Sequence, residues 1–207
     1  MKLKWLGHSC FKLTLDNGSA LVTDPYDEQV GYPPLRVRAD VALSSHGHFD
    51  PCCFDALEGD PEIINAPGEF EVPGARIIGV PSFHDDAKGK NRGANLIFVI
   101  EADGLRIVHL GDLGHLPETP AQKAAVSNAD VLLIPIGGFF TIDTPTAVKL
   151  IETYRPCCAI AMHYANAYCH FPVSDAAEFV RLTGAQTLPN EIELTKAAPV
   201  GCAVMEI

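Results

Sequence analysis

The segment that most constrains the fold of this 207-residue chain is Ser-His-Gly-His-Phe-Asp at residues 45–50. It directly follows an apolar stretch, 41–44, which we predict to be a short strand. Alternate residues of an extended loop point to the same side, so His46, His48 and Asp50 can converge on one point. Imidazole and carboxylate groups are zinc ligands, and three of them with an open position are typical of a catalytic site. The fold must therefore bring further ligands to the end of this strand.

Three more ligand candidates occupy the same kind of position. His84 follows the apolar run GVPSF, Asp112 follows RIVHLG, and His163 follows CCAIAM. Residues on loops that a rigid scaffold holds are favoured places for a functional site. Each of these residues alone would more simply be a strand-end polar group. Together with residues 46–50 they predict one shared metal site.

The predicted elements begin with strands and continue with strands mixed with helices. The alternating or apolar runs predict strands at 2–6, 10–15, 20–23, 131–135 and 157–163, and a hairpin over 94–110 that turns at Asp103-Gly104. Cap residues predict helices that begin near Thr119, near Asp143 and at Ser174. Two sheets with helices packed outside them, in one domain over residues 1–207, satisfy this order.

Composition narrows the classes of partner. The net charge of −11 gives no electrostatic footprint for nucleic acid and predicts repulsion from anionic membranes. No stretch approaches the roughly 20 apolar residues of a membrane-spanning helix, and the N-terminal segment lacks the apolar core of a signal peptide. Seven cysteines without a Cys-x-x-Cys motif are typical of reduced thiols in a cytoplasmic protein. We expect a small-molecule substrate, which could be anionic because a bound metal reverses the local sign of charge. Assembly into a homo-oligomer stays open.

The motifs in their order, WLGHSCF, TDP, SHGHFD, SFHD, HLGD, IPIGGFFT and MHY, resemble those of the metallo-β-lactamase superfamily. The resemblance includes the branch that contains L-ascorbate-6-phosphate lactonase and other Zn-dependent hydrolases. It implies an α/β fold, an αββα sandwich of two mixed β-sheets flanked by helices, with the metal site at one edge. It also implies a metal-dependent hydrolase that uses a metal-bound hydroxide on a small ester, lactone or phosphoester.

Carried over residue by residue, the resemblance implies six metal ligands. They are His46, His48, Asp50, His84, Asp112 and His163. His46, His48 and His84 would hold the first zinc ion, and Asp112 would bridge that ion to a second one. Asp50 and His163 would help to hold that second ion. The two aspartates would also be catalytic, because they can orient the attacking water.

One departure from the superfamily pattern concerns the second metal position. The motif H-x-H-x-D-H ends in histidine where this chain has Pro51, whose side chain carries no ligand atom. We therefore expect one tight zinc site and a second site that is weak or absent. Manganese is a second candidate for the weaker site, because carboxylate-rich sites suit it. Cys52 and His115 are candidates for the missing place.

Further residues are candidates for supporting roles. Asp24 in TDP and His8 in LGHS flank the site in the superfamily, where they would orient ligands by hydrogen bonding. His115 in GDLGH is a candidate for substrate contact or proton donation. The polar loop 85–93 is either a solvated loop or a mobile rim, whose Lys88, Lys90 or Arg92 would meet an anionic substrate.

Three classes of function follow. The first, which we favour, is a hydrolase of a small molecule. The second is a degenerate metal-binding protein with weak or no catalysis, and Pro51 is the feature in its favour. The third is a phosphodiesterase that acts on nucleic acid, against which the acidic net charge argues.

Overall fold

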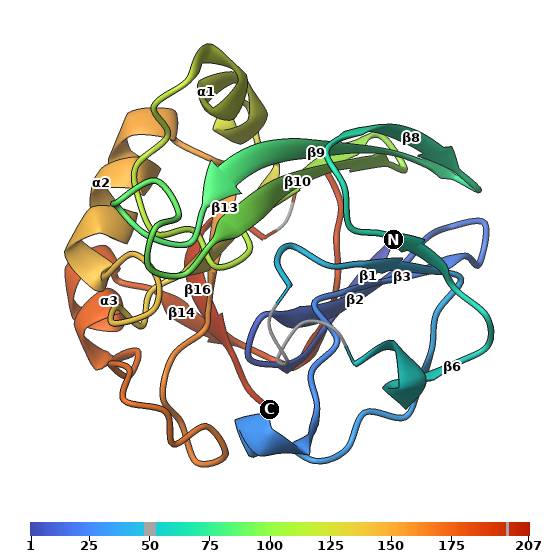
Figure 1. Cartoon of the computed structure of the whole chain (residues 1–207), viewed down its shortest axis with the longest axis horizontal. Helices are drawn as coiled ribbons and strands as arrows, with labels where there is room; N and C mark the ends of the chain where they lie inside the picture. Colours follow the sequence, from blue (N-terminus) through green and yellow to red (C-terminus); the bar gives the residue numbers. More distant parts are fainter. Residues whose placement is uncertain (48–52, 198) are drawn as a thin grey trace.

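The computed structural model describes residues 1–47, 53–197 and 199–207, and in them the alternating N-terminal strands open the first of two large sheets (Figure 1). Its six strands lie in the order β15 (Glu191–Glu193), β1 (Lys2–Gly7), β2 (Cys10–Thr14), β3 (Ala20–Thr23), β5 (Val41–Leu43) and β7 (Glu62–Ile64). The first four are antiparallel, whereas β3, β5 and β7 run parallel. Leu3 and Trp5 of β1 point into the core, whereas the alternate residues Lys2 and Lys4 do not.

The second sheet has eight strands. In spatial order they are β14 (Gln186–Leu188), β16 (Gly201–Met205), β13 (Cys158–Met162), β12 (Val131–Pro135), β11 (Leu105–His109), β10 (Ala94–Ala102), β9 (Ala75–Phe83) and β8 (Gly68–Val72). The predicted hairpin is present, and Asp103 and Gly104 turn it with positive φ angles of 49° and 73°. From β11 to β14 the neighbouring strands are parallel, so their C-terminal ends share one edge.

The three α-helices of the described chain are α1 (Pro120–Val126), α2 (Thr144–Tyr154) and α3 (Ala177–Thr183), and they lie on one side of the molecule (Figure 1). Helix α1 contacts β9 and β10, and α3 contacts β16. Two predicted starts are confirmed, because Thr119 forms a capping box and Asp143 caps α2. The predicted start at Ser174 is wrong. Backbone hydrogen bonds tie Ser174 to Gly137 and Ala165, so α3 begins three residues later.

The outer face of the first sheet is covered differently. Its apolar cover comes from loops and from two 3₁₀-helices, Glu28–Val30 and Phe54–Ala56. Together with residues of the sheet such as Val22, residues of this cover such as Tyr26 and Tyr32 form a second cluster of buried residues. A short pair of strands, β4 (Val37–Arg38) and β6 (Leu57–Glu58), belongs to the same region. In the part of the chain that the structure describes, the helical layer of the predicted sandwich is therefore on the second sheet.

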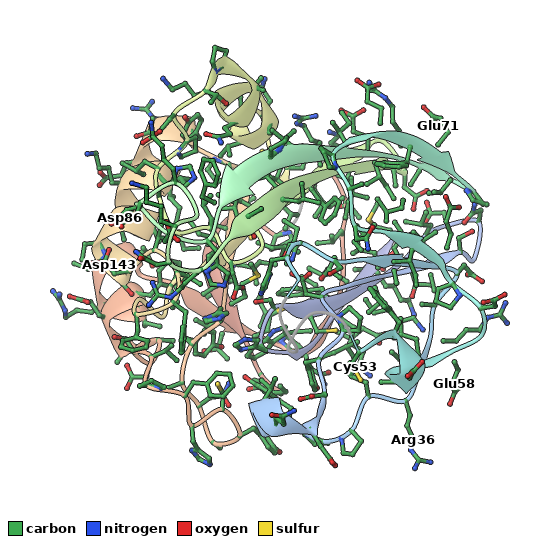
Figure 2. All side chains as sticks on the ribbon, viewed as in Figure 1. Arg36, Cys53, Glu58, Glu71, Asp86 and Asp143 are labelled. Carbon is green, nitrogen blue, oxygen red and sulfur yellow. The ribbon has the colours of Figure 1, made fainter. Side chains whose placement is uncertain are left out.

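The main core lies between the two sheets. It includes Trp5 and Phe11 from the first sheet and Phe98 and Ile107 from the second, all nearly inaccessible to solvent. Charged side chains lie on the outside, among them Arg36, Glu58, Glu71, Asp86 and Asp143 (Figure 2). None of the described helices is long and apolar enough to cross a membrane.

Candidate metal centre

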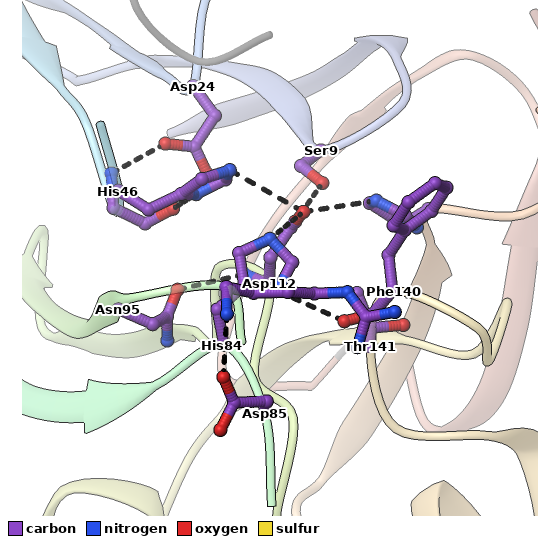
Figure 3. A network of polar contacts seen from close by, with 12 residues as sticks. Ser9, Asp24, His46, His84, Asp85, Asn95, Asp112, Phe140 and Thr141 are labelled. Carbon is purple, nitrogen blue, oxygen red and sulfur yellow. Dashed lines mark hydrogen bonds and ion pairs between the residues drawn. The ribbon is translucent and has the colours of Figure 1, made fainter. Parts of the chain in front are cut away.

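Six histidines and aspartates from distant parts of the sequence lie close together at one edge of the sandwich, and Figure 3 labels four of them, Asp24, His46, His84 and Asp112. His8 lies in the turn between β1 and β2, and each of the other five follows the end of a strand. These are Asp24 after β3, His46 after β5, His84 after β9, Asp112 after β11 and His163 after β13. All six are buried, and the most exposed of them, His46, has only 8% of its surface accessible. The strand ends thus place these residues as the sequence pattern predicts.

Asp112 lies at the centre of the cluster. Its Oδ2 atom is 3.6 Å from Nε2 of His46, 3.2 Å from Nε2 of His84 and 3.1 Å from Nε2 of His163. This buried oxygen accepts no hydrogen bond from the described residues, although three ring nitrogens face it. The ligand atoms of His46, His84 and Asp112 all lie within 4.8 Å of one another, as a metal site requires.

The partners of the outer ring nitrogens show which ring nitrogens face Asp112. Nδ1 of His84 lies 3.0 Å from the carbonyl oxygen of Phe140. A carbonyl oxygen only accepts, so Nδ1 carries a proton, and in the neutral ring, which is the form that binds a metal, the lone pair of Nε2 faces Asp112. This lone pair and the carboxylate oxygen repel each other unless a cation lies between them. The arrangement therefore fits a divalent metal ion held by His46, His84 and Asp112.

His46 is oriented through a short chain of hydrogen bonds. Oγ of Ser45 donates to Oδ2 of Asp24 at 2.9 Å, so it can accept from Nδ1 of His46, which is also 2.9 Å away. Asp24 accepts two further bonds, from the backbone N–H of Ser45 at 2.7 Å and from Nε2 of His109 at 2.6 Å. Asp24 thus holds Ser45, the neighbour of His46, through both its backbone and its side chain.

Asp112 is itself fixed by neighbours from both sheets. Oγ of Ser9 donates to Oδ1 of Asp112 at 3.2 Å. The backbone N–H of Asp112 donates to Oδ1 of Asn95 at 2.9 Å. Burial would raise the pKa of Asp112, but the imidazoles of His163 and His46 outweigh it and hold the pKa well below its usual range. The side chain is therefore available as a charged ligand.

A second group of three ligands shares Asp112. The ligand atoms of His8, Asp112 and His163 also lie within 4.8 Å of one another, and the two imidazole rings are 4.1 Å apart. Both histidines have left-handed backbone conformations, with φ angles of 51° and 53°, although neither is glycine. Such strain concentrates at functional sites. Sequence reasoning gave His8 only an orienting role, whereas the structure offers its ring as a ligand.

The other predicted site residues divide into two sets. His48, Asp50, Pro51 and Cys52 lie outside the described residues. His115 lies beside the site, but the backbone engages both of its ring nitrogens. Nε2 accepts from Phe83 N–H at 3.2 Å, and Nδ1 donates to the carbonyl oxygen of Leu116 at 2.7 Å. In this conformation His115 has no ring nitrogen left for a metal or a substrate and instead holds the end of β9.

Sequence reasoning missed four residues that support the ligands. They are Ser9, Ser45, Asn95 and His109, all buried. Asn95 gave the clearest signal, because an amide at the start of a strongly apolar strand must find partners when it is buried. Here its amide group donates to Ser82 and to the backbone of Leu110, which fixes its oxygen toward Asp112.

A cavity of about 440 Å³ opens beside the cluster. Ser45 and His46 line one part of it, and Asn65, Arg92 and Leu96 line others. Its size suits a small molecule rather than a polymer.

Comparisons with known proteins agree with this geometry. The model of the beta-lactamase superfamily domain matches residues 2–163. A UPF0173 metal-dependent hydrolase of Thermoplasma acidophilum is 30% identical over 190 residues, which cover 79% of this chain and 83% of that protein. A second such protein, from Thermococcus onnurineus, is 28% identical, and the match covers 89% of this chain and 92% of the relative. Among solved structures, a candidate Zn-dependent hydrolase of the metallo-β-lactamase superfamily from Thermotoga maritima superposes with a TM-score of 0.82. It is 35% identical, with coverage of 99% of this chain and 97% of that one.

Proposed function

The chain belongs to the metallo-β-lactamase superfamily of metal-dependent hydrolases, and we propose that it uses zinc to hydrolyse a small ester, lactone or phosphoester in the cytoplasm. The observation that carries the proposal is the buried Oδ2 atom of Asp112, which three histidine Nε2 atoms face at 3.1–3.6 Å. A donor set of imidazoles and one carboxylate suits zinc. The modest cavity beside His46 supports a small substrate.

His46, His84 and Asp112 would hold the first ion. When bound, zinc supplies Lewis acidity, which makes water nucleophilic near neutral pH and polarises the bond to be cleaved. The protein's own contribution is to fix the ligands. The carbonyl oxygen of Phe140 and the hydroxyl of Ser45 hold the outer nitrogens of the two histidines, so that the inner nitrogens keep their direction. Asp50, which lies outside the described residues, is the second proposed catalytic aspartate.

His8, Asp112 and His163 would hold a second ion. Pro51 removes the histidine that the superfamily motif places there, and His8 is positioned to add an imidazole instead. His8→Ala should then lower the number of bound metal equivalents while the first site stays filled, as elemental analysis of dialysed protein would measure. An unchanged stoichiometry of two would contradict the assignment of His8, and a wild-type stoichiometry of one would favour the expectation of a weak second site.

The competing proposal is a metal-binding protein whose catalysis has decayed. The missing motif histidine at Pro51 favours it. The two proposals differ in turnover rather than in metal content, because both need His46 and His84.

A turnover screen with chromogenic esters, lactones, phosphomonoesters and phosphodiesters tests the proposed function. We expect hydrolysis of at least one class by the zinc-loaded protein and its loss in His84→Ala. His170→Ala is the matched control, because His170 is exposed and belongs to neither ligand group. If the fully loaded wild type turns over none of these classes, the proposal of a decayed enzyme gains support. If both variants keep full activity, the site is wrongly assigned.

A further inference from the structure

Arg92 has its guanidinium group close to two aromatic rings, Phe139 and Phe140, which are nearly perpendicular to each other. Its Cζ atom is 5.7 Å from the ring centre of Phe139 and 5.5 Å from that of Phe140. The backbone carbonyl oxygen of Phe140 also accepts a hydrogen bond from Nδ1 of His84, so Phe140 contacts both Arg92 and a proposed metal ligand. Arg92 lines the same cavity as His46. A substrate that fills this cavity can therefore reach both the metal centre and the guanidinium group.

The loop that carries Arg92 is held in place from within. The carboxylate of Asp85 is buried and accepts four backbone N–H groups, those of Ala87, Gly89, Asn91 and Arg92, at 2.7–2.9 Å. The loop also closes on the metal centre through a bond from the backbone N–H of His84 to the carbonyl oxygen of Gly93. These bonds fix the backbone of the loop at Arg92, while Asp86, Lys88 and Lys90 are exposed, as the prediction of a solvated loop expects.

Within the described residues the charge of Arg92 meets aromatic rings but no carboxylate. Four other arginines form ion pairs with carboxylates, namely Arg38, Arg76, Arg106 and Arg181. Arg92 forms none with any described carboxylate, although the protein as a whole is acidic and the metal centre contains Asp112. An arginine that lies against aromatic rings keeps N–H donors available for an oxyanion.

We propose that Arg92 binds an anionic group of the substrate, a carboxylate or a phosphate remote from the bond that is cleaved. The inference rests on the proposed hydrolase function and narrows its substrates to acidic small molecules. Arginine recognises both oxyanions by paired, charge-assisted hydrogen bonds. Phe140 connects the two sites, because its ring contacts the guanidinium group of Arg92 and its backbone carbonyl oxygen accepts from Nδ1 of His84.

Matched pairs of substrates test the proposal. Each pair shares one scissile ester and differs only in whether a remote carboxylate, or in a second series a remote phosphate, is present. We expect Arg92→Gln to lower kcat/KM about 10- to 100-fold for the charged member of at least one series, chiefly through KM, and to leave the neutral member unchanged. The series that is affected identifies the oxyanion. Arg92→Lys should retain part of the preference, because it keeps the charge but loses the paired geometry.

Lys90→Gln is the matched control, because it removes a positive charge from the same loop. Lys90 is exposed, does not line the cavity, and its amide does not bond to Asp85. Equal losses in Arg92→Gln and Lys90→Gln would reduce the effect to long-range charge and overturn the proposal. An equal loss for charged and neutral substrates would overturn it as well.

A binding measurement separates this proposal from the proposed hydrolase function. The shift in Tm that inorganic phosphate causes can be measured in the zinc-loaded wild type, in Arg92→Gln and in Lys90→Gln. We expect a smaller shift in Arg92→Gln alone. That result without turnover of any substrate would reject the hydrolase and keep the anion site. Equal shifts in all three proteins, together with equal kinetics, would reject the anion site and leave the hydrolase intact.

Discussion

Replacement of Asp24 should loosen the metal centre without touching a ligand. Its buried carboxylate accepts three bonds, from the backbone and hydroxyl of Ser45 and from His109, at 2.6–2.9 Å. In Asp24→Asn the amide oxygen can keep the bond to the Ser45 backbone. The amide nitrogen then faces Nε2 of His109, which must give up its proton to accept. His109 would have to move that proton to Nδ1, a buried atom with no hydrogen-bond partner among the described residues.

The magnitude follows from the groups that lose their partners. A buried donor that is left unsatisfied costs about 1–3 kcal/mol. Asp24→Asn leaves one such group, the ring of His109, without a partner, so it should lower the free energy of unfolding of the metal-free protein by about that amount. Asp24→Ala leaves at least the Ser45 amide and the His109 ring without partners. It should therefore lower the free energy of unfolding by about 2–6 kcal/mol, a large part of a typical stability of about 5–15 kcal/mol. Because Ser45 orients His46, zinc affinity should also fall by about 10- to 100-fold in Asp24→Asn.

Two measurements check this prediction. Urea unfolding in the presence of a chelator gives the stability of the metal-free protein, and competition with a chromogenic chelator gives its zinc affinity. Asp40→Asn is the control. Asp40 accepts a hydrogen bond from the backbone N–H of Ala20 at 2.9 Å. Ala20 is the first residue of β3, whereas Asp24 follows the last residue of that strand, at the end where the ligands lie. If Asp24→Asn bound zinc as tightly as Asp40→Asn, the chain from Asp24 through Ser45 to His46 would have no role in metal binding.

Three further changes test separate parts of the structure. Thr119→Ala removes the capping box of α1 and should lower the free energy of unfolding by about 1 kcal/mol, measured by urea unfolding. Gly114→Ala would press a methyl group against the backbone of His84, so it should cost about 1–3 kcal/mol and weaken zinc binding, and normal zinc affinity in this variant would contradict the close packing there. Alkylation followed by peptide mapping should modify exposed Cys157 well before Cys10, because Cys10 is buried and burial raises its thiol pKa. Faster modification of Cys10 would show that this part of the core opens.

Local sequence signals predicted the elements that carry strong patterns of their own. The strands β3 and β12 have the predicted bounds, and the β10–β11 hairpin turns at the predicted Asp103-Gly104. The strands β14 and β15 were not predicted, because they have only three residues each and gain their order from pairing with neighbours. The strand β16 was not predicted either. Only the C-terminal end of β9 was predicted, as the apolar run GVPSF before His84, because Gly79 and Pro81 interrupt the strand's apolar pattern.

The site was predictable to the extent that its ligands are chemically unusual side chains at strand ends. Histidine and aspartate after an apolar run mark such a position, so the sequence alone groups His84, Asp112 and His163. It does not reveal the residues that aim these ligands, because Ser9 and Ser45 are ordinary polar residues in the sequence. Their roles come from contacts across the two sheets, such as the bond from Ser9 to Asp112 over a separation of 103 residues.

The most direct test of the metal centre is a crystal structure of the zinc-loaded protein with anomalous diffraction data collected at the zinc edge. We predict an anomalous peak at ~2.0–2.2 Å from Nε2 of His46, Nε2 of His84 and a carboxylate oxygen of Asp112. A second, weaker peak should lie between His8, His163 and Asp112. The absence of any peak at these three residues in a crystal that holds zinc elsewhere would contradict the assignment of the centre and of the hydrolase function that depends on it.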